Sequence, residues 1–197
     1  MVLGENRKCQ RAMFDRFSGG SQYLYEGGIS LEKSGGIMTS LKIRKAQLED
    51  LPELNRVLRA SKGHWGYSQA YLDEFMEKLG VTENCIANYQ IFCVNVDDQF
   101  VGFYGFRKNE DDKDELDFFF LDPRYIGKGI GLLMWDSCLD TAKTLGIKDF
   151  VLNSEPNAET FYLKLGCKKI GYKKSVVSWE TRSIPIMSYS LEATHRE

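Results

Sequence analysis

The sequence lacks the features that mark several large classes of protein. No apolar run approaches the roughly 18 residues that a membrane-spanning helix needs, and the amino terminus has no apolar stretch typical of a signal peptide. The 26 basic residues nearly balance the 28 acidic ones, so bulk charge gives no indication of nucleic-acid binding. We therefore expect a cytoplasmic protein with no membrane or nucleic-acid partner.

Cysteines are few and follow no recognisable pattern. The chain has five, at positions 9, 85, 93, 138 and 167, and they form neither a C-x-x-C pair nor a Cys/His spacing typical of a metal site. An odd, scattered set is typical of reduced thiols. Because the chain has 197 residues, 43% of them hydrophobic, it can bury a core without disulfides or a metal ion. The composition predicts one folded domain and no metal site.

The first 37 residues differ from the rest. They are rich in glycine, with Ser-Gly-Gly at 18–20 and again at 34–36, and they show no persistent helical or strand period. Met38 follows, and a clear strand pattern begins soon after it. We expect residues 1–37 to be a flexible leader or a non-native extension, and residues 38–197 to be the functional domain. The alternative is a native arm that packs on a partner subunit.

Beyond this leader the hydrophobic pattern alternates between strands and helices. Asp97-Asp98 lies between two apolar runs and predicts a hairpin, and Ser68 and Gly146 are typical of a helix start and a helix end. Strands are predicted over 41–46, 89–96, 100–106, 115–122 and 149–153, followed by two final strands. Helices are predicted over 48–58, 68–79, 124–145 and 157–165.

The most informative segment is Arg124–Gly131, which reads R-Y-I-G-K-G-I-G. It lies between the apolar run 116–121 and the helical pattern that begins at Leu132. The first turn of a helix carries unpaired backbone N–H groups and a partial positive charge, and glycines let a phosphate approach that backbone closely. The order of strand, glycine-rich turn and helix therefore predicts a site for a small molecule that carries a diphosphate.

The spacing of this segment excludes two common phosphate-binding loops. A Walker A loop requires Ser or Thr directly after its lysine, but Lys128 is followed by Gly129. A dinucleotide-binding fingerprint has its third glycine three positions after the second, and here Gly131 comes too early. What remains is the pattern R-x-x-G-x-G, formed by Arg124, Gly127 and Gly129.

This pattern resembles the pyrophosphate loop of the GNAT superfamily of N-acetyltransferases, which bind acetyl-coenzyme A. The segment Asn157–Cys167, N-A-E-T-F-Y-L-K-L-G-C, is similar to a second motif of the same family. Ser61–Tyr67 and Arg182–Met187 resemble, more loosely, a loop between the first two helices and a closing strand. The resemblance covers residues 41–192. It implies an α+β fold with a central mixed, mostly antiparallel sheet of about seven strands, splayed between strands four and five, and helices on both faces.

The resemblance also implies where acetyl-coenzyme A, the cosubstrate, would lie. In the family, amides of the glycine-rich turn bind the pyrophosphate and the backbone of strand four pairs with the pantetheine arm. Many members carry arginine at the position of Ile126, so we expect one phosphate contact of the family to be absent here. The residues that this implies for the cofactor are Phe119, Phe120, Leu121, Arg124, Ile126, Gly127, Lys128, Gly129, Ile130, Gly131 and Asn157.

Three side chains are candidates for the proton transfers. Tyr162 occupies the position of the family's catalytic tyrosine, and the reference pKa values of a phenol and a thiol differ by only about 1.5 units, which suits protonation of the leaving thiolate. By resemblance, Glu115 or Asp117 removes the proton of the amine. Three alternatives remain open for that role: both acids only end a charged turn, His64 is the base, or the amine arrives neutral.

The acceptor is expected under the loop around residues 61–70. His64, Trp65 and Tyr67 are the candidate substrate-binding residues, because aromatic faces suit a cation or an apolar group. Closing the core over the first helices is an equally good interpretation of these aromatic residues. Local acids favour a small cationic amine, and a peptide amine is the alternative. The strand at 184–189 is a candidate homodimer interface.

We therefore predict an enzyme that transfers an acetyl group from acetyl-coenzyme A to a primary amine by direct attack. One alternative is a non-catalytic acyl-coenzyme A sensor that retains the turn. Another is a transferase for longer acyl chains, which the bulky run 118–120 disfavours. A route through an acyl-cysteine at Cys138 or Cys167 is also disfavoured, because neither residue has a histidine nearby in the sequence.

Overall fold

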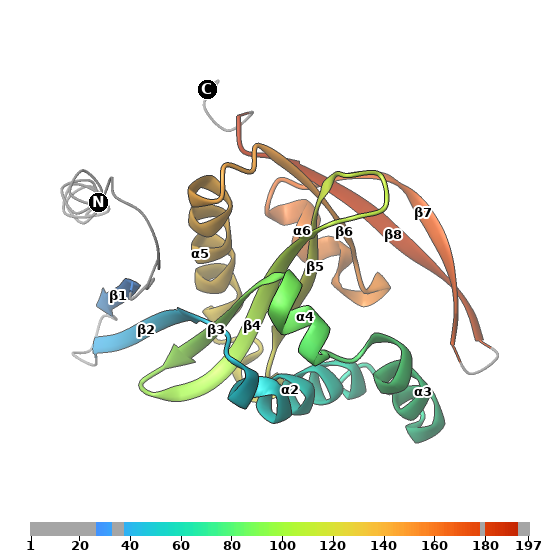
Figure 1. The fold of residues 1–197 in the computed structure, drawn as a ribbon, viewed down its shortest axis with the longest axis horizontal. Helices are drawn as coiled ribbons and strands as arrows, with labels where there is room; N and C mark the ends of the chain where they lie inside the picture. Colours follow the sequence, from blue (N-terminus) through green and yellow to red (C-terminus); the bar gives the residue numbers. More distant parts are fainter. Residues whose placement is uncertain (1–26, 33–37, 178–179, 193–197) are drawn as a thin grey trace.

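The computed structural model describes residues 27–32, 38–177 and 180–192, which form a single mixed sheet with helices on both faces (Figure 1). The strands follow the order β1-β2-β3-β4-β5-β6-β8-β7. Their bounds are β1 Gly27–Glu32, β2 Met38–Lys45, β3 Gln90–Val96, β4 Gln99–Lys108, β5 Asp114–Leu121, β6 Asp149–Asn153, β7 Lys168–Val177 and β8 Glu180–Ser190. The α-helices are α2 Leu51–Gly63, α3 Gln69–Leu79, α4 Glu83–Asn88, α5 Ile130–Thr144 and α6 Glu159–Lys164.

The core has two layers, one on each face of the sheet. Helices α2, α3 and α4 cover one face, where Leu58 and Phe75 pack against strand residues such as Phe103. Helices α5 and α6 cover the other face, where Trp135 and Tyr162 pack against further strand residues. Each helix buries its apolar stripe against the sheet, which is the arrangement expected of a layered α+β domain. Within the described residues, no helix is long and apolar enough to cross a membrane.

A β-bulge interrupts β5 next to β4. Gly105 pairs with Phe118 and Phe106 pairs with Leu116, so Asp117 is the extra residue without a partner on β4. A bulge shifts the alternation of side chains by one position. Leu116 accordingly packs into the layer under α5, whereas Phe118, two positions later, packs into the layer under α2 and α3.

Beyond the bulge, β5 separates from β6. The two strands are parallel, and their pairing is limited to Glu115 with Val151. The rest of each strand then continues toward the same end of the sheet without pairing to the other. This confirms the predicted splay between the fourth and fifth strands and the predicted α+β class.

Several elements differ from the sequence-based expectation. The leader contributes β1, which adds an eighth strand beside β2, and the rest of residues 1–37 lies outside the described residues. The division at residue 37 stays a prediction. Helix α4 was not predicted, because six residues, Glu83–Asn88, are too short for a periodic pattern. Helix α2 runs through Gly63, so part of the expected loop 61–67 is helical.

The expected helix over 124–145 is interrupted. Pro123–Tyr125 forms a separate turn of 3-10 helix, and α5 begins only at Ile130, after the glycines. Its end is confirmed, because Gly146 has a φ of +75°, the left-handed conformation in which glycine ends helices. The helix expected over 157–165 is also divided, and Asn157 lies within the 3-10 turn Pro156–Ala158 and does not cap α6.

The last strand in the sequence is not at the edge of the sheet. Strand β8 pairs with β6 on one side and with β7 on the other. Residues 186–188 are therefore paired on both sides within the chain, so this part of the segment 184–189 is not available to a second subunit as an edge strand. A homodimer stays a prediction, but the edge available on this side of the sheet belongs to β7.

Candidate active site

A cavity of about 760 Å³ opens where β5 and β6 separate. One wall is the end of β5, from Leu116 to Leu121, and the other is the end of β6 with the turn that follows it. The glycine-rich turn before α5 closes one side, and α6 contributes Phe161 and Tyr162. Residues of α2 and α3 close the remaining side. A volume in this range is typical of a site for a small molecule.

The glycine-rich turn presents free amides to this cavity. Gly127 and Gly129 have φ values of +77° and +81°, which glycine adopts at no steric cost. The amides of Ile126 and Lys128 donate to carbonyls of the preceding turn. In the described part of the chain, the amides of Gly127, Gly129, Ile130 and Gly131 donate to no acceptor, so they are available to an anion at the start of α5.

Arg124 stabilises this turn from outside the cavity. Its guanidinium donates to Asp122 at 3.0 and 2.7 Å, and Arg56 donates to the same carboxylate at 3.0 Å. These arginines hold the pKa of the buried Asp122 well below its usual value. Neither Arg124 nor Lys128 lines the cavity, whereas the exposed Ile126 does. The arginine of the motif therefore positions the turn, and its predicted contact with the cofactor stays untested.

Three predicted cofactor residues, Phe119, Phe120 and Leu121, form the β5 wall of the cavity. On the side of β4 their backbones are paired, and on the side of β6 they face the open space. Backbone N–H and C=O groups at such an edge can pair with an extended ligand as another strand would. Asn157 also lines the cavity, from the β6 side, and donates to Glu155 at 3.3 Å.

Tyr162 reaches the cavity from α6. Its ring packs edge-on against Phe119, Trp135 and Phe161. The side chain is buried, and its hydroxyl makes no hydrogen bond with any described residue. Burial raises the pKa of this phenol, so the hydroxyl keeps its proton at neutral pH. A neutral, unshared hydroxyl on a cavity wall is available to donate to a ligand.

The two candidate bases lie on β5 but in different environments. Glu115 is buried where β5 and β6 still pair, contacts Arg107 at 2.9 Å and accepts from Asn153 at 2.6 Å. Burial raises the pKa of its carboxyl. Asp117, the bulged residue, lines the cavity and contacts Arg107 at 3.1 Å. Asp117 is thus the carboxylate that meets the cavity, and Glu115 lies behind it.

A cluster that sequence reasoning did not predict is centred on Glu155, in the turn after β6. Its carboxylate accepts from Lys62 at 2.6 Å, from Tyr67 at 2.5 Å and from Arg182 at 2.8 Å. Arg182 also donates to Tyr71 at 2.7 Å. Glu155, Lys62 and Tyr71 line the cavity, so this cluster marks the end of the cavity beneath α2 and α3.

The ionisation of the cluster follows from burial and from mutual contact. Burial alone would raise the pKa of Glu155, but Lys62, Tyr67 and Arg182 together hold it below its usual value. Burial lowers the pKa of Lys62, although Glu155 opposes that shift. Of the predicted substrate residues, Trp65 lines the cavity, Tyr67 supports it from behind through Glu155, and the exposed His64 does not reach it.

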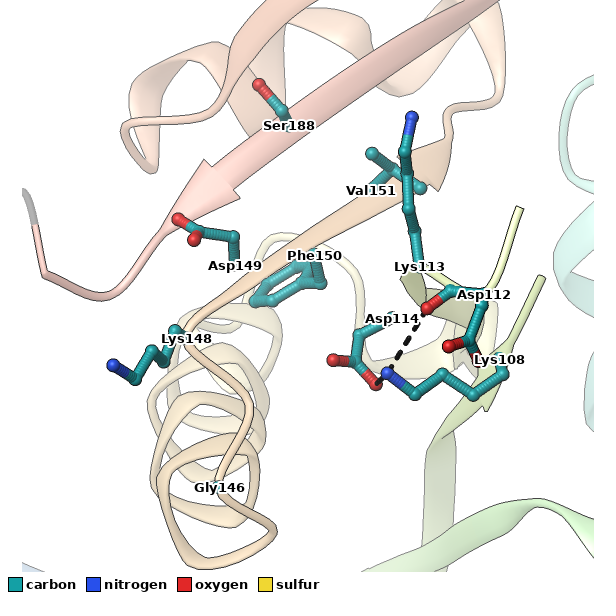
Figure 2. Close-up of a pocket in the computed structure, with 10 residues that line it drawn as sticks. All are labelled: Lys108, Asp112, Lys113, Asp114, Gly146, Lys148, Asp149, Phe150, Val151 and Ser188. Carbon is teal, nitrogen blue, oxygen red and sulfur yellow. Dashed lines mark hydrogen bonds and ion pairs between the residues drawn. The ribbon is translucent and has the colours of Figure 1, made fainter.

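A second, smaller hollow of about 370 Å³ lies at the opposite ends of β5 and β6 (Figure 2). It mixes charges of both signs: Lys108 contacts the carboxylate of Asp114 at 3.1 Å and the carbonyl oxygen of Asp112 at 3.3 Å, and Lys148 and Asp149 lie on its other side. None of the predicted site residues lines it. The predicted residues gather instead at the larger cavity.

Comparison with known proteins identifies the family. Residues 59–189 match the family model described as an acetyltransferase (GNAT) domain. The PaiA N-acetyltransferase of Thermoplasma acidophilum, solved in complex with coenzyme A, is similar with 25% identity and a TM-score of 0.60, over 77% of this chain and 99% of that one. No curated protein matches significantly.

Two further structures share the fold. A GCN5-related N-acetyltransferase from Rhodopseudomonas palustris has 16% identity and a TM-score of 0.62, over 87% of this chain and all of its own. The ribosomal-protein-S18-alanine N-acetyltransferase of Escherichia coli has 17% identity and a TM-score of 0.56, over 77% of this chain and 94% of its own. Because the family model covers more than half of the sequence, this chain belongs to the GNAT acetyltransferase family.

Proposed function

We propose that this protein is an N-acetyltransferase that moves an acetyl group from acetyl-coenzyme A to a primary amine by direct attack. The observation that carries the proposal is the continuity of one cavity. It begins at the free amides of Gly127, Gly129, Ile130 and Gly131, passes between the unpaired edges of β5 and β6, and ends at the Glu155 cluster. A diphosphate, an extended arm and an acceptor amine would meet these three parts in that order.

The donor would be held mainly by backbone groups. The amides at the start of α5 suit the pyrophosphate, because four of them lack other partners in the described chain. The open edge of β5 at Phe119–Leu121 suits the amide groups of pantetheine, and one N–H there can stabilise the oxyanion of the thioester. Acetyl-coenzyme A is the predicted cosubstrate, and the family match supports it.

Direct attack is favoured over an acyl-cysteine route by the positions of the thiols. Cys85, Cys93, Cys138 and Cys167 are buried, and no cysteine among the described residues lines the cavity. Burial raises the pKa of Cys138 and raises that of Cys167 to about 12, which suppresses the nucleophilic thiolate. The amine of the acceptor is therefore the nucleophile in our proposal, and Tyr162 donates a proton to the departing thiolate.

Asp117→Asn is expected to lower kcat/KM by about 10²-fold at neutral pH, because Asp117 is the carboxylate on the cavity that can accept the amine's proton. An alkylamine loses its own proton near pH 10, so the deficit should shrink as the pH approaches that value. Rates of acetyl transfer between pH 6.5 and 10 measure both effects.

The matched control for this variant is Asp114→Asn. Asp114 lies on the same strand and pairs with Lys108, but it lines the small hollow and not the cavity (Figure 2). The Asp114→Asn variant should transfer acetyl groups as fast as the unmodified protein does. An Asp117→Asn variant that reacts normally at neutral pH would remove Asp117 as the base and leave Glu115, His64 or an already neutral amine.

The function itself is tested by mixing the full chain with acetyl-coenzyme A and a panel of primary amines. Amine-dependent release of free coenzyme A, with acetylated amine detected by mass spectrometry, is the expected result. Tight binding of acetyl-coenzyme A without release for any amine would contradict the proposal and favour the acyl-coenzyme A sensor. Faster transfer from octanoyl- than from acetyl-coenzyme A would contradict the choice of acyl group.

A further inference from the structure

The Glu155 cluster carries an excess of positive charge. One carboxylate, Glu155, lies between two cations, Lys62 and Arg182, and the side chains of these cations are only 12% and 14% exposed. A charge removed from water is costly unless a partner compensates it. One of the two cations therefore has no counter-ion within the cluster, at a place where Lys62 lines the cavity.

The other charges around the cavity do not remove this excess. Asp117 and Glu115 share Arg107. A second cation, Lys173 of β7, lines the cavity near these acids. Among the described residues, Asp117 and Glu155 line the cavity and no other acid does. The imbalance is thus confined to the end of the cavity formed by Lys62, Glu155 and Arg182.

Hydrogen-bond donors at this end also have spare capacity. The ammonium of Lys62 has three N–H groups, and within the described parts of the chain it donates one hydrogen bond, to Glu155. The oxygen of Tyr71 accepts from Arg182, so the proton of that hydroxyl remains available to another acceptor. Both side chains line the cavity. A negatively charged group that only accepts hydrogen bonds is the ligand that fits these two donors.

We infer that the acceptor amine also carries a carboxylate, as an amino acid does, and that Lys62 and Tyr71 bind this carboxylate. The inference rests on the proposed transferase function and names its substrate class. The carboxylate would supply the counter-ion that the cluster lacks, and the amine would face Asp117 and the thioester. A diamine or polyamine would instead add positive charge to a positive pocket, so this inference replaces the sequence-based expectation of a small cationic amine.

The test uses pairs of amines that differ only in the carboxylate. Each common amino acid is assayed beside the amine that its decarboxylation gives, with the full chain and saturating acetyl-coenzyme A. For the best pair, kcat/KM should be about 10- to 100-fold higher with the carboxylate, the range expected for hydrogen bonds to a charged group. Lys62→Gln should reduce that preference by about 10-fold or more.

Two further variants guard against a trivial loss of folding. Tyr71→Phe removes only a hydroxyl and should lower kcat/KM for the amino acid by a smaller factor. Because it also breaks the hydrogen bond from Arg182, its melting temperature should fall by about 2–4 °C, with the fold retained. Lys148→Gln, at the small hollow, should leave the preference intact (Figure 2). Equal or faster transfer to the decarboxylated amines would overturn the inferred carboxylate site but would leave the proposed transferase function intact. Absence of transfer to any amine would overturn the proposed function, and the inference with it.

Discussion

The Tyr162→Phe variant is expected to lose about 10²-fold or more of its turnover number while it keeps its fold and its affinity for acetyl-coenzyme A. Its hydroxyl lines the cavity and makes no hydrogen bond with the described residues, so the change removes a proton donor and breaks no internal contact. The ring would still pack edge-on against Phe119, Trp135 and Phe161. Single-turnover and steady-state rates, beside a thermal melt, measure the effect.

The raised pKa of Tyr162 is compatible with the proposed role of this residue as the acid. The same burial acts on thiols nearby, since it raises the pKa of Cys167 to about 12. A thiolate leaving group in this apolar surrounding would likewise hold a proton more strongly than in water. Donor and acceptor pKa values therefore rise together, and proton transfer from phenol to thiolate remains nearly balanced.

Tyr104→Phe is the matched control for this prediction. Tyr104 is also a buried tyrosine, but its hydroxyl shares a hydrogen bond with Thr141 at 2.8 Å and the side chain lies away from the cavity. This variant should lose about 1 kcal/mol of unfolding free energy and keep its turnover number. Loss of stability without loss of turnover in Tyr162→Phe would show that Tyr162 is a structural residue.

Glu155→Gln is expected to have the largest effect on stability. It leaves Lys62 and Arg182 as two mostly buried cations without a counter-ion, a change that costs about 3 kcal/mol of unfolding free energy in comparable cases. For a domain of this size the melting temperature should fall by about 6–12 °C. Thermal and urea unfolding of the two proteins at pH 7 provide the comparison.

Lys62→Met distinguishes an excess of charge from a simple loss of contacts. It removes the same ion pair from the other side, but it leaves Glu155 with Arg182, one anion with one cation. Its unfolding free energy should therefore stay within about 1 kcal/mol of the unmodified protein's. Equal destabilisation by Glu155→Gln and Lys62→Met would contradict the charge imbalance on which the inferred carboxylate site depends.

The contribution of Glu155 to the free energy of unfolding should also depend on pH, and it should decrease as the pH falls. Its pKa is lowered in the folded protein, so the carboxylate contributes stability above the unfolded pKa of about 4.3. That contribution is lost as the pH falls through the folded pKa. The difference between the unmodified protein and Glu155→Gln should therefore be constant near neutrality and shrink below about pH 4.

Local features of the site could be predicted from the sequence because neighbouring residues determine them. Gly127 and Gly129 occupy left-handed conformations directly before a helix, and that requirement is visible in the spacing of the glycines. The Asp97-Asp98 turn is similar, since φ values of 48° and 63° suit a two-residue hairpin. The separation of β5 from β6 could be predicted only from the family resemblance, because no residue pattern within either strand specifies it.

The Glu155 cluster could not be predicted, because its members are distant in the sequence. Glu155 lies 93 residues from Lys62, 88 from Tyr67 and 27 from Arg182. Only the packing of α2 and β8 around the turn after β6 brings them together, so no local pattern indicates it. The start of α5 was misplaced for the opposite reason. The predicted helix extends back to residue 124, but the left-handed conformations of Gly127 and Gly129 delay its start to Ile130.

The single pairing between β5 and β6 has a consequence for the protein without its cosubstrate. The edges of β5 and β6 that face each other form an internal seam in an otherwise continuous sheet. Unpaired strand edges invite other strands, but here α5 and α6 on one face and α2 and α3 on the other cover the seam. A cosubstrate bound along the open edge of β5, as proposed, would bridge the two halves of the sheet at this seam.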